Sequence, residues 1–212
     1  MSQSPNTMHY VLVLDRSGSM SNRMDDVVGA VNEQLDALRA AALETSKLCQ
    51  VTLVRFDNEI ETVFEDRNVL DVPPIHPNDV FPRGSTSLID ATVTSIERTA
   101  ERVLEATLAR TASVAIIVYT DGGENSSSLR TSDDLKRALT TYQNLEGWDI
   151  AFIGADPSAI ETMKSAGFNE QKMAYVQAEN SHLAMRRMSS SLREKLAFDR
   201  TFDIKEDFED LN

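Results

Sequence analysis

Short apolar runs alternate with longer stretches of helical periodicity along the whole chain. The runs at 9–15 and 113–121 are apolar at consecutive positions, which is typical of central strands in a parallel sheet covered on both faces. The stretch at 24–43 instead repeats apolar residues at helical spacing, and it begins with Asp25 and Asp26, which complement a helix dipole. This alternation predicts parallel strands joined by crossover helices.

The rest of the chain continues the pattern. Only Asn58 and Glu59 separate the runs 49–57 and 60–66. This spacing suits a hairpin, so we expect the second run to be an antiparallel strand at the edge of the sheet. The remaining predicted elements are a helix within 84–106 that follows a loop at 84–86, helices at 132–145, 157–166 and 181–198, and strands at 148–156 and 172–177.

The length of 212 residues suits one domain with a sizeable core. We expect a single domain at 8–198, followed by an acidic tail at 199–212. The tail could end in solvent or could place a carboxylate in a neighbouring molecule's site, and we expect the solvated end.

The charge balance limits the classes of partner that the chain is expected to bind. The chain carries 21 Lys and Arg against 34 Asp and Glu, a formal net charge of -13, which disfavours nucleic acid and anionic membrane surfaces and favours cations. The single cysteine, Cys49, allows no internal disulfide, and the chain has no Cys and His spacing typical of a zinc site. We find no signal peptide and no membrane span in the sequence, so we expect a cytoplasmic protein.

Oxygen-bearing side chains follow the predicted strands. Asp15 and Asp121 come at the ends of two apolar runs, Ser17 and Ser19 follow the first, and Thr86 lies in a loop before a helix. In an open parallel α/β sheet, ligands bind at the carboxyl ends of the strands. If the two strands are neighbours, the five side chains converge, and an all-oxygen set with few charges suits a hard cation such as Mg²⁺.

Structural readings of the same residues are available. Ser17 and Ser19 could cap the helix that follows, and Thr86 could be the N-cap of its own helix. Capping does not explain why a carboxylate recurs after both strands.

Catalytic readings are weaker on the sequence. A serine nucleophile needs a positioned base, but the histidines lie in three separate predicted elements, namely at His9, His76 and His182. A phosphate loop needs glycine patterns that "DRSGSMS" lacks. A Mg-dependent phosphohydrolase is the enzyme alternative, although Ser17 stands where a DxD motif would place its second aspartate.

Three segments together resemble the metal-ion-dependent adhesion site (MIDAS) of von Willebrand factor A domains. They are "DRSGSM" at 15–20, Thr86 within "RGSTSLIDA", and "YTDGGENS" from Tyr119. The resemblance covers about 10–156 by motif. It implies a doubly wound, Rossmann-like α/β sheet that is mostly parallel, with one antiparallel edge strand, helices on both faces and a divalent cation at its top.

The resemblance also implies roles. Asp15, Ser17 and Ser19 would hold the metal from the first loop, Thr86 would ligate directly in one state, and Asp121 would ligate directly or through water. Mg²⁺ is the expected ion, with Mn²⁺ and Ca²⁺ as alternatives. A Glu or Asp of a partner protein would complete the coordination, so the expected function is binding and not catalysis.

The loop "DGGENSSS" at 121–128 resembles stand-alone bacterial and phage members of the family, which are cytosolic. Some bacterial members work beside AAA+ ATPases, so such a system is one expected partner. Glu124 and Asn125 are expected at the rim or in the turn. In some members the last helix moves when the site changes state, and a switch at 181–198 is a hypothesis by that analogy.

Overall fold

One six-stranded sheet forms the centre of the molecule. The computed structural model describes residues 5–204 and 208. The strand order is β3-β2-β1-β4-β5-β6, and every pairing is parallel except that of β3 with β2. The strands are β1 (Thr7–Asp15), β2 (Leu48–Phe56), β3 (Ile60–Asn68), β4 (Ala112–Thr120), β5 (Trp148–Gly154) and β6 (Met173–Tyr175). The predicted mostly parallel sheet with one antiparallel edge strand is confirmed.

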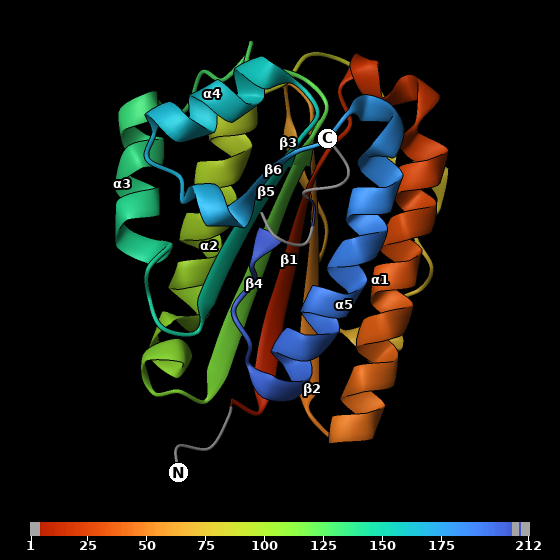
Figure 1. Cartoon of the computed structure of the whole chain (residues 1–212), viewed down its shortest axis with the longest axis vertical. Helices are drawn as coiled ribbons and strands as arrows, with labels where there is room; N and C mark the ends of the chain where they lie inside the picture. Colours follow the sequence, from red (N-terminus) through yellow and green to blue (C-terminus); the bar gives the residue numbers. More distant parts are fainter. Residues whose placement is uncertain (1–4, 205–207, 209–212) are drawn as a thin grey trace.

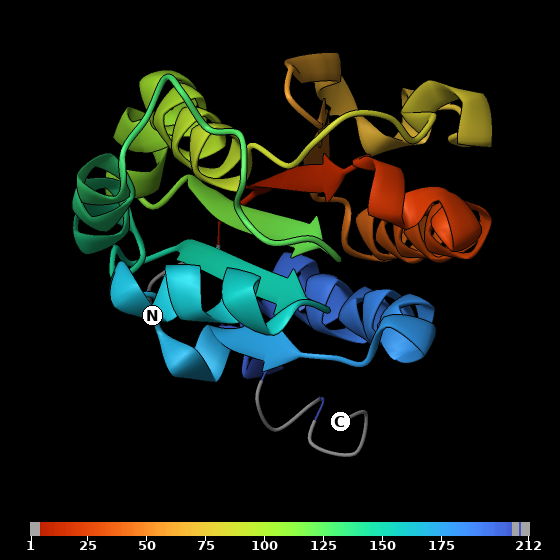
Figure 2. The same cartoon turned by 90° about the horizontal axis from the view of Figure 1, so that it is seen from above.

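Helices cover both faces of this sheet (Figure 1, Figure 2). On one face lie α1 (Met24–Thr45) and α5 (Ser181–Phe198), and on the other lie α2 (Leu88–Leu108), α3 (Ser132–Tyr142) and α4 (Pro157–Ser165). The helical repeat predicted near the N-terminus is the buried side of α1. Within the described part of the chain, no helix is long and apolar enough to cross a membrane.

The central pair of strands places two aspartates at the same edge of the sheet. β1 and β4 are hydrogen-bonded neighbours, with Leu14 opposite Tyr119. Asp15 ends β1 and Asp121 directly follows β4. The strands are parallel and in this register, so both carboxylates lie at the top edge, as the sequence led us to expect.

One predicted loop and one strand end can be compared with the structure. α2 begins at Leu88, after the predicted loop at 84–86, in which Gly84 has a left-handed φ of 69°, a conformation that favours glycine and interrupts a helix. A Cβ at this position would lie 2.2 Å from Asn58 Oδ1. β5 ends at Gly154 and not at 156, because Asp156 caps α4 and Pro157 begins it.

The segment after α5 is packed and not solvated where the structure describes it. Phe202, Ile204 and Phe208 are 4%, 0% and 1% exposed and belong to the core cluster on the α1 and α5 side of the sheet. In Figure 1 the chain turns back along the sheet after α5. The expectation of a solvated tail is therefore wrong for these residues, because their apolar side chains outweigh the acidic composition around them. Residues 205–207 and 209–212 lie outside the described part.

A buried carboxylate fastens α5 to the opposite end of the sheet. Asp149 in β5 is 1% exposed, and its Oδ2 lies 2.7 Å from Lys195 Nζ in the last turn of α5. Its Oδ1 pairs with Lys172, which precedes β6. One carboxylate thus holds two buried lysines from two elements. Removing it would leave Lys195 with only Asp199, whose Oδ1 lies 3.3 Å from Nζ, and would take from Lys172 the carboxylate it pairs with.

The packing of the tail predicts a stability difference between two phenylalanines. Phe202→Ala should lower the free energy of unfolding by about 3–5 kcal/mol, because it leaves a cavity in the core. Phe198→Ala is the matched control, because Phe198 is 69% exposed, and it should change the value by less than about 0.5 kcal/mol. Urea denaturation measures both, and equal effects would contradict the packed tail.

Candidate metal centre

Asp15 organises the loop after β1. Its Oδ1 accepts a hydrogen bond from the backbone N–H of Ser17 at 2.6 Å, and its Oδ2 accepts one from the Thr120 hydroxyl at the end of β4. Asp15 is fully buried. The carboxylate therefore turns the chain after β1 and ties this loop to the neighbouring strand.

The two serine hydroxyls of this loop link the aspartates. Ser17 Oγ lies 3.0 Å from Ser19 Oγ, and Ser19 Oγ donates to Asp121 Oδ1 at 2.5 Å. Ser17 is the N-cap of a short 3-10 helix (Gly18–Asn22), but its side chain makes no capping hydrogen bond. Both serine hydroxyls face polar site atoms, so helix capping does not account for them.

Thr86 joins the same cluster from the loop before α2. Its backbone N–H donates to Asn125 Oδ1 at 2.8 Å, and Ser87, not Thr86, is the N-cap of α2. A Cβ added to Gly122 would lie 2.9 Å from Thr86 Oγ1, 3.5 Å from Ser19 Oγ and 3.6 Å from Ser17 Oγ. Three hydroxyls thus converge on one point that stays open because residue 122 is glycine.

The electrostatics of the cluster favour a cation. Burial raises the pKa of Asp15 to about 6, against the hydrogen bonds from Thr120 and Ser17 that lower it. Burial also raises the pKa of Asp121, which the hydrogen bond from Ser19 and the charge of Arg23 oppose. Both carboxylates therefore lack part of the positive surroundings that a buried anion needs.

The donor chemistry fits a hard divalent ion. The cluster offers two carboxylates and three hydroxyls, and oxygen ligands of this kind suit Mg²⁺, Mn²⁺ or Ca²⁺. Among the described residues, no group of three or more His, Cys, Asp and Glu could hold a metal, so a soft-metal or carboxylate-rich site is not present there. The five predicted site residues come together. The three hydroxyls supply neutral oxygen ligands, in place of a third carboxylate.

A second polar network lies beneath the first loop and fixes its shape. The buried Arg16 side chain points away from the hydroxyls, with Nε 3.1 Å from Asp57 Oδ2 and Nη2 2.8 Å from Glu61 Oε1. Arg83 Nε lies 2.8 Å from the same Asp57 oxygen. The backbone follows the same route, because Gly18 N–H donates to the carbonyl of Gly84 at 3.2 Å. The loops that carry the serines and Thr86 are thereby held to each other.

The loop after β4 is held by carboxylates that accept backbone N–H groups. Asp90 accepts from Ser128 and Arg130 at 2.9 and 2.7 Å. Glu124 accepts from Ser127 and from Ile89 at 2.8 Å each. The expectation that Glu124 and Asn125 serve in the turn fits these contacts.

His9 and His76 make their contacts away from the serines. His9 Nδ1 pairs with Asp66 Oδ1 at 2.9 Å, near the opposite end of β1. His76 accepts from the backbone N–H of Asn78 and caps the 3-10 helix Pro77–Val80. Each described histidine contact thus has a structural purpose away from Ser17 and Ser19, so a nucleophilic serine has no positioned base among them.

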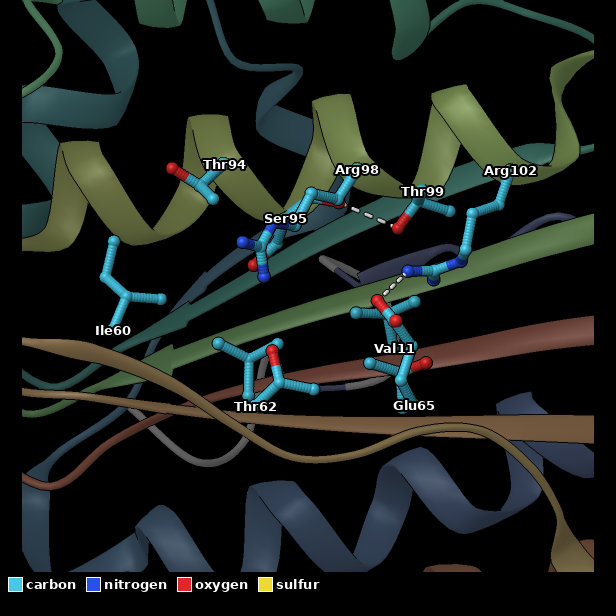
Figure 3. A pocket seen from close by; sticks show the side chains of 11 residues that line it. Val11, Ile60, Thr62, Glu65, Thr94, Ser95, Arg98, Thr99 and Arg102 are labelled. Carbon is cyan, nitrogen blue, oxygen red and sulfur yellow. Dashed lines mark hydrogen bonds and ion pairs between the residues drawn. The ribbon is translucent and has the colours of Figure 1, made fainter.

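A separate hollow between α2 and the sheet edge has no part in the cluster (Figure 3). Its enclosed space is about 10 Å³, which is room for one water at most. Arg102 closes it by pairing with Glu65, as the dashed line in Figure 3 shows. None of the five predicted site residues lines it.

Several contributors to the site were not predicted. Their contacts join residues that are far apart in sequence or on different loops, namely Thr120 with Asp15, Arg23 with Asp121 and Arg16 with Asp57. A polar residue at a strand end was the only available signal for Thr120, and no periodic pattern marks the arginines.

Solved structures show what the fold resembles. The von Willebrand factor domain of the type V pili tip protein Mfa5 from Porphyromonas gingivalis matches with a TM-score of 0.60 at 12% identity, over 92% of this chain and 97% of that one. The PilB minor pilin from Streptococcus sanguinis matches with a TM-score of 0.60 at 14% identity, over 94% of this chain and 63% of that one. The chain has a von Willebrand factor A-type fold.

Proximal thread matrix protein 1 from the mussel byssus has the same fold, with a TM-score of 0.60 at 12% identity over 92% of this chain. Another structure of that byssus protein has a zinc-occupied MIDAS motif. This chain spans 49% of the byssus protein and 63% of the pilin. At these identities the likeness establishes the A-type fold alone. No family model matches the chain, and no curated protein matches it.

The arginine network under this A-type site predicts a pH effect. The hydrogen bond from Arg16, and then that from Arg55, lower the pKa of Glu61 to about 2 from 4.5. Since the folded pKa is the lower one, Glu61 stabilises the fold above about pH 4.5, and this contribution is lost as the pH falls towards 2. Glu61→Gln should therefore be less stable than the parent near neutral pH and lose less stability on acidification.

Urea midpoints measured between about pH 7 and pH 2 test this difference. Glu101→Gln, which removes an exposed carboxylate on α2, is the matched control and should follow the parent. Parallel curves for the parent and Glu61→Gln would contradict the role of Glu61.

Proposed function

We propose that the chain is a metal-dependent protein-binding module. Asp15, Ser17, Ser19, Thr86 and Asp121 would hold a divalent cation, most simply Mg²⁺, and an acidic side chain of a partner protein would bind there. The observation that carries the proposal is the convergence of three hydroxyls beside two under-compensated carboxylates.

The residues of the chain divide the work. Asp15 supplies buried negative charge, and the Ser17 and Ser19 hydroxyls and Thr86 supply neutral oxygens. With only two carboxylates on a divalent ion, the site keeps affinity for one more anion. Bound there, the cation would supply an open coordination position for a carboxylate from outside.

The partner and its setting extend this proposal. A bacterial or phage AAA+ ATPase system is the partner class that the motif resemblance suggests, and an acidic segment of such a protein would supply the Glu or Asp. The cytoplasmic location stays a prediction. The similarity to pilus proteins concerns the fold and does not carry their setting to this chain.

The metal site predicts a loss of binding in Asp15→Ala. Calorimetric titration of the metal-stripped protein with Mg²⁺ and Mn²⁺ should give binding by the parent and none by the mutant, because the mutant loses its buried carboxylate. Asp36→Asn, at a side chain that is 74% exposed, is the control and should bind as the parent does. Undiminished binding by Asp15→Ala would show that the site lies elsewhere.

A second substitution guards against a folding defect at Asp15. Gly122→Ala removes no ligand but places a methyl group 2.9 Å from Thr86 Oγ1, so Thr86 must shift. We expect weaker Mg²⁺ binding with an unchanged circular dichroism spectrum. Mg²⁺ affinity equal to that of the parent would show that the point beside Gly122 is not part of the site.

The proposal also predicts the absence of an enzymatic reaction. Incubation with p-nitrophenyl phosphate and Mg²⁺ or Mn²⁺ should release no more nitrophenol than buffer with the same metal. Ser17 stands where a DxD motif would have its second aspartate, and His9 and His76 make their contacts away from the cluster, so neither is placed there as a general acid. Metal-dependent turnover that is lost in Asp15→Ala would instead establish the phosphohydrolase alternative.

A further inference from the structure

Asp121 forms an ion pair with Arg23 and accepts a hydrogen bond from Ser19. Arg23 Nη1 lies 2.8 Å from Oδ2, and Ser19 Oγ donates to Oδ1 at 2.5 Å. The Asp121 side chain is 1% exposed, so water does not replace either contact readily. A cation that binds Asp121 directly therefore comes close to the Arg23 guanidinium.

Arg23 is the N-cap residue of α1, but its side chain is placed to act as a cation. Its backbone N–H donates to Met20 and its carbonyl accepts from Val27, while its side chain makes no capping hydrogen bond to α1. The side chain is 27% exposed. Among the ion pairs of the described residues, Arg23 supplies the only positive charge on Asp15 or Asp121.

A guanidinium on Asp121 opposes a second cation at the same carboxylate. Like charges repel more strongly at a buried site than in water. Arginine keeps its proton at any ordinary pH, so deprotonation cannot relieve this repulsion. The repulsion is relieved when the guanidinium turns away from Asp121, and another anion that pairs with the guanidinium favours this movement.

We propose that Arg23 couples metal binding to the acidic partner, an inference that rests on the function proposed above. Arg23 restrains cation binding while it pairs with Asp121, and it releases Asp121 when a partner carboxylate pairs with the guanidinium. The planar fork of arginine suits a carboxylate. The surface therefore fits a partner segment with two neighbouring acidic residues, one for the metal and one for Arg23.

Linkage makes this coupling measurable from the metal side. If the acidic partner raises the affinity of the protein for the metal, the metal raises the affinity for the acidic partner by the same factor. The probe is Mg²⁺ titrated calorimetrically into metal-stripped protein, once in chloride buffer and once in acetate buffer of equal ionic strength. The proteins are the parent, Arg23→Gln and Arg23→Lys, the last of which keeps the charge.

The expected results separate charge from structure. In chloride, Arg23→Gln should bind Mg²⁺ at least about fivefold more tightly than the parent, because the repelling charge is gone. Acetate should tighten Mg²⁺ binding by the parent at least about threefold more than it does for Arg23→Gln. Arg23→Lys should keep both properties of the parent in weaker form.

Arg110→Gln is the matched control. Arg110 also pairs with a carboxylate, that of Glu146 at 2.5 Å, but it lies before β4 at the other end of the sheet. It should bind Mg²⁺ as the parent does in both buffers, and thermal melting checks that all variants fold.

The outcomes distinguish this inference from the function on which it rests. The role of Arg23 is overturned, and the metal site is retained, if the parent binds Mg²⁺ and Arg23→Gln binds it no more tightly. The same holds if acetate changes the Mg²⁺ affinity of both proteins equally. Binding by Arg23→Gln but not by the parent in chloride supports the restraint. Absence of Mg²⁺ binding by every variant in both buffers overturns the metal site and the coupling together.

Discussion

Asp15 places a carboxylate out of water at the end of a central strand, and the top of the sheet is arranged around it. Burial of a charge is costly unless hydrogen bonds or a counter-ion offset it. The Ser17 N–H and the Thr120 hydroxyl each donate to one oxygen. Burial raises the pKa of Asp15 to about 6 against these two hydrogen bonds, so they offset the cost only in part. The same two contacts set the direction of the serine loop and hold it to β4. The buried Asp15 carboxylate therefore both shapes the loop and favours a cation beside it.

The chain around this carboxylate separates two kinds of polar contact. Ser17 turns towards the oxygen cluster, whereas the adjacent Arg16 turns to Asp57 and Glu61. Asp90 and Glu124 engage the backbone of the loop after β4. The loops at the site are thus fixed by residues that need not touch a ligand, which keeps the hydroxyls and carboxylates of the cluster in position.

Much of this arrangement could be read from the sequence, for identifiable reasons. Consecutive apolar residues marked the central strands, and a parallel sheet collects their ends at one edge, so the meeting of Asp15 and Asp121 was predictable. Pairing between distant loops leaves no periodic trace, and for that reason Arg23 and the Arg16–Asp57 pair were missed. The tail was misjudged because acidic residues dominate its composition, whereas Phe202 and Ile204 decide its position.

The attachment of α5 has a consequence for cooperativity. Its last turn is joined to Asp149 through Lys195, and Phe202, shortly after the helix, is buried in the core. A displacement of α5 along its axis would have to separate a buried ion pair and extract an aromatic side chain in the same event. The last helix and the tail therefore behave as one unit, and the end of the sheet that lies opposite the oxygen cluster determines how far α5 can move.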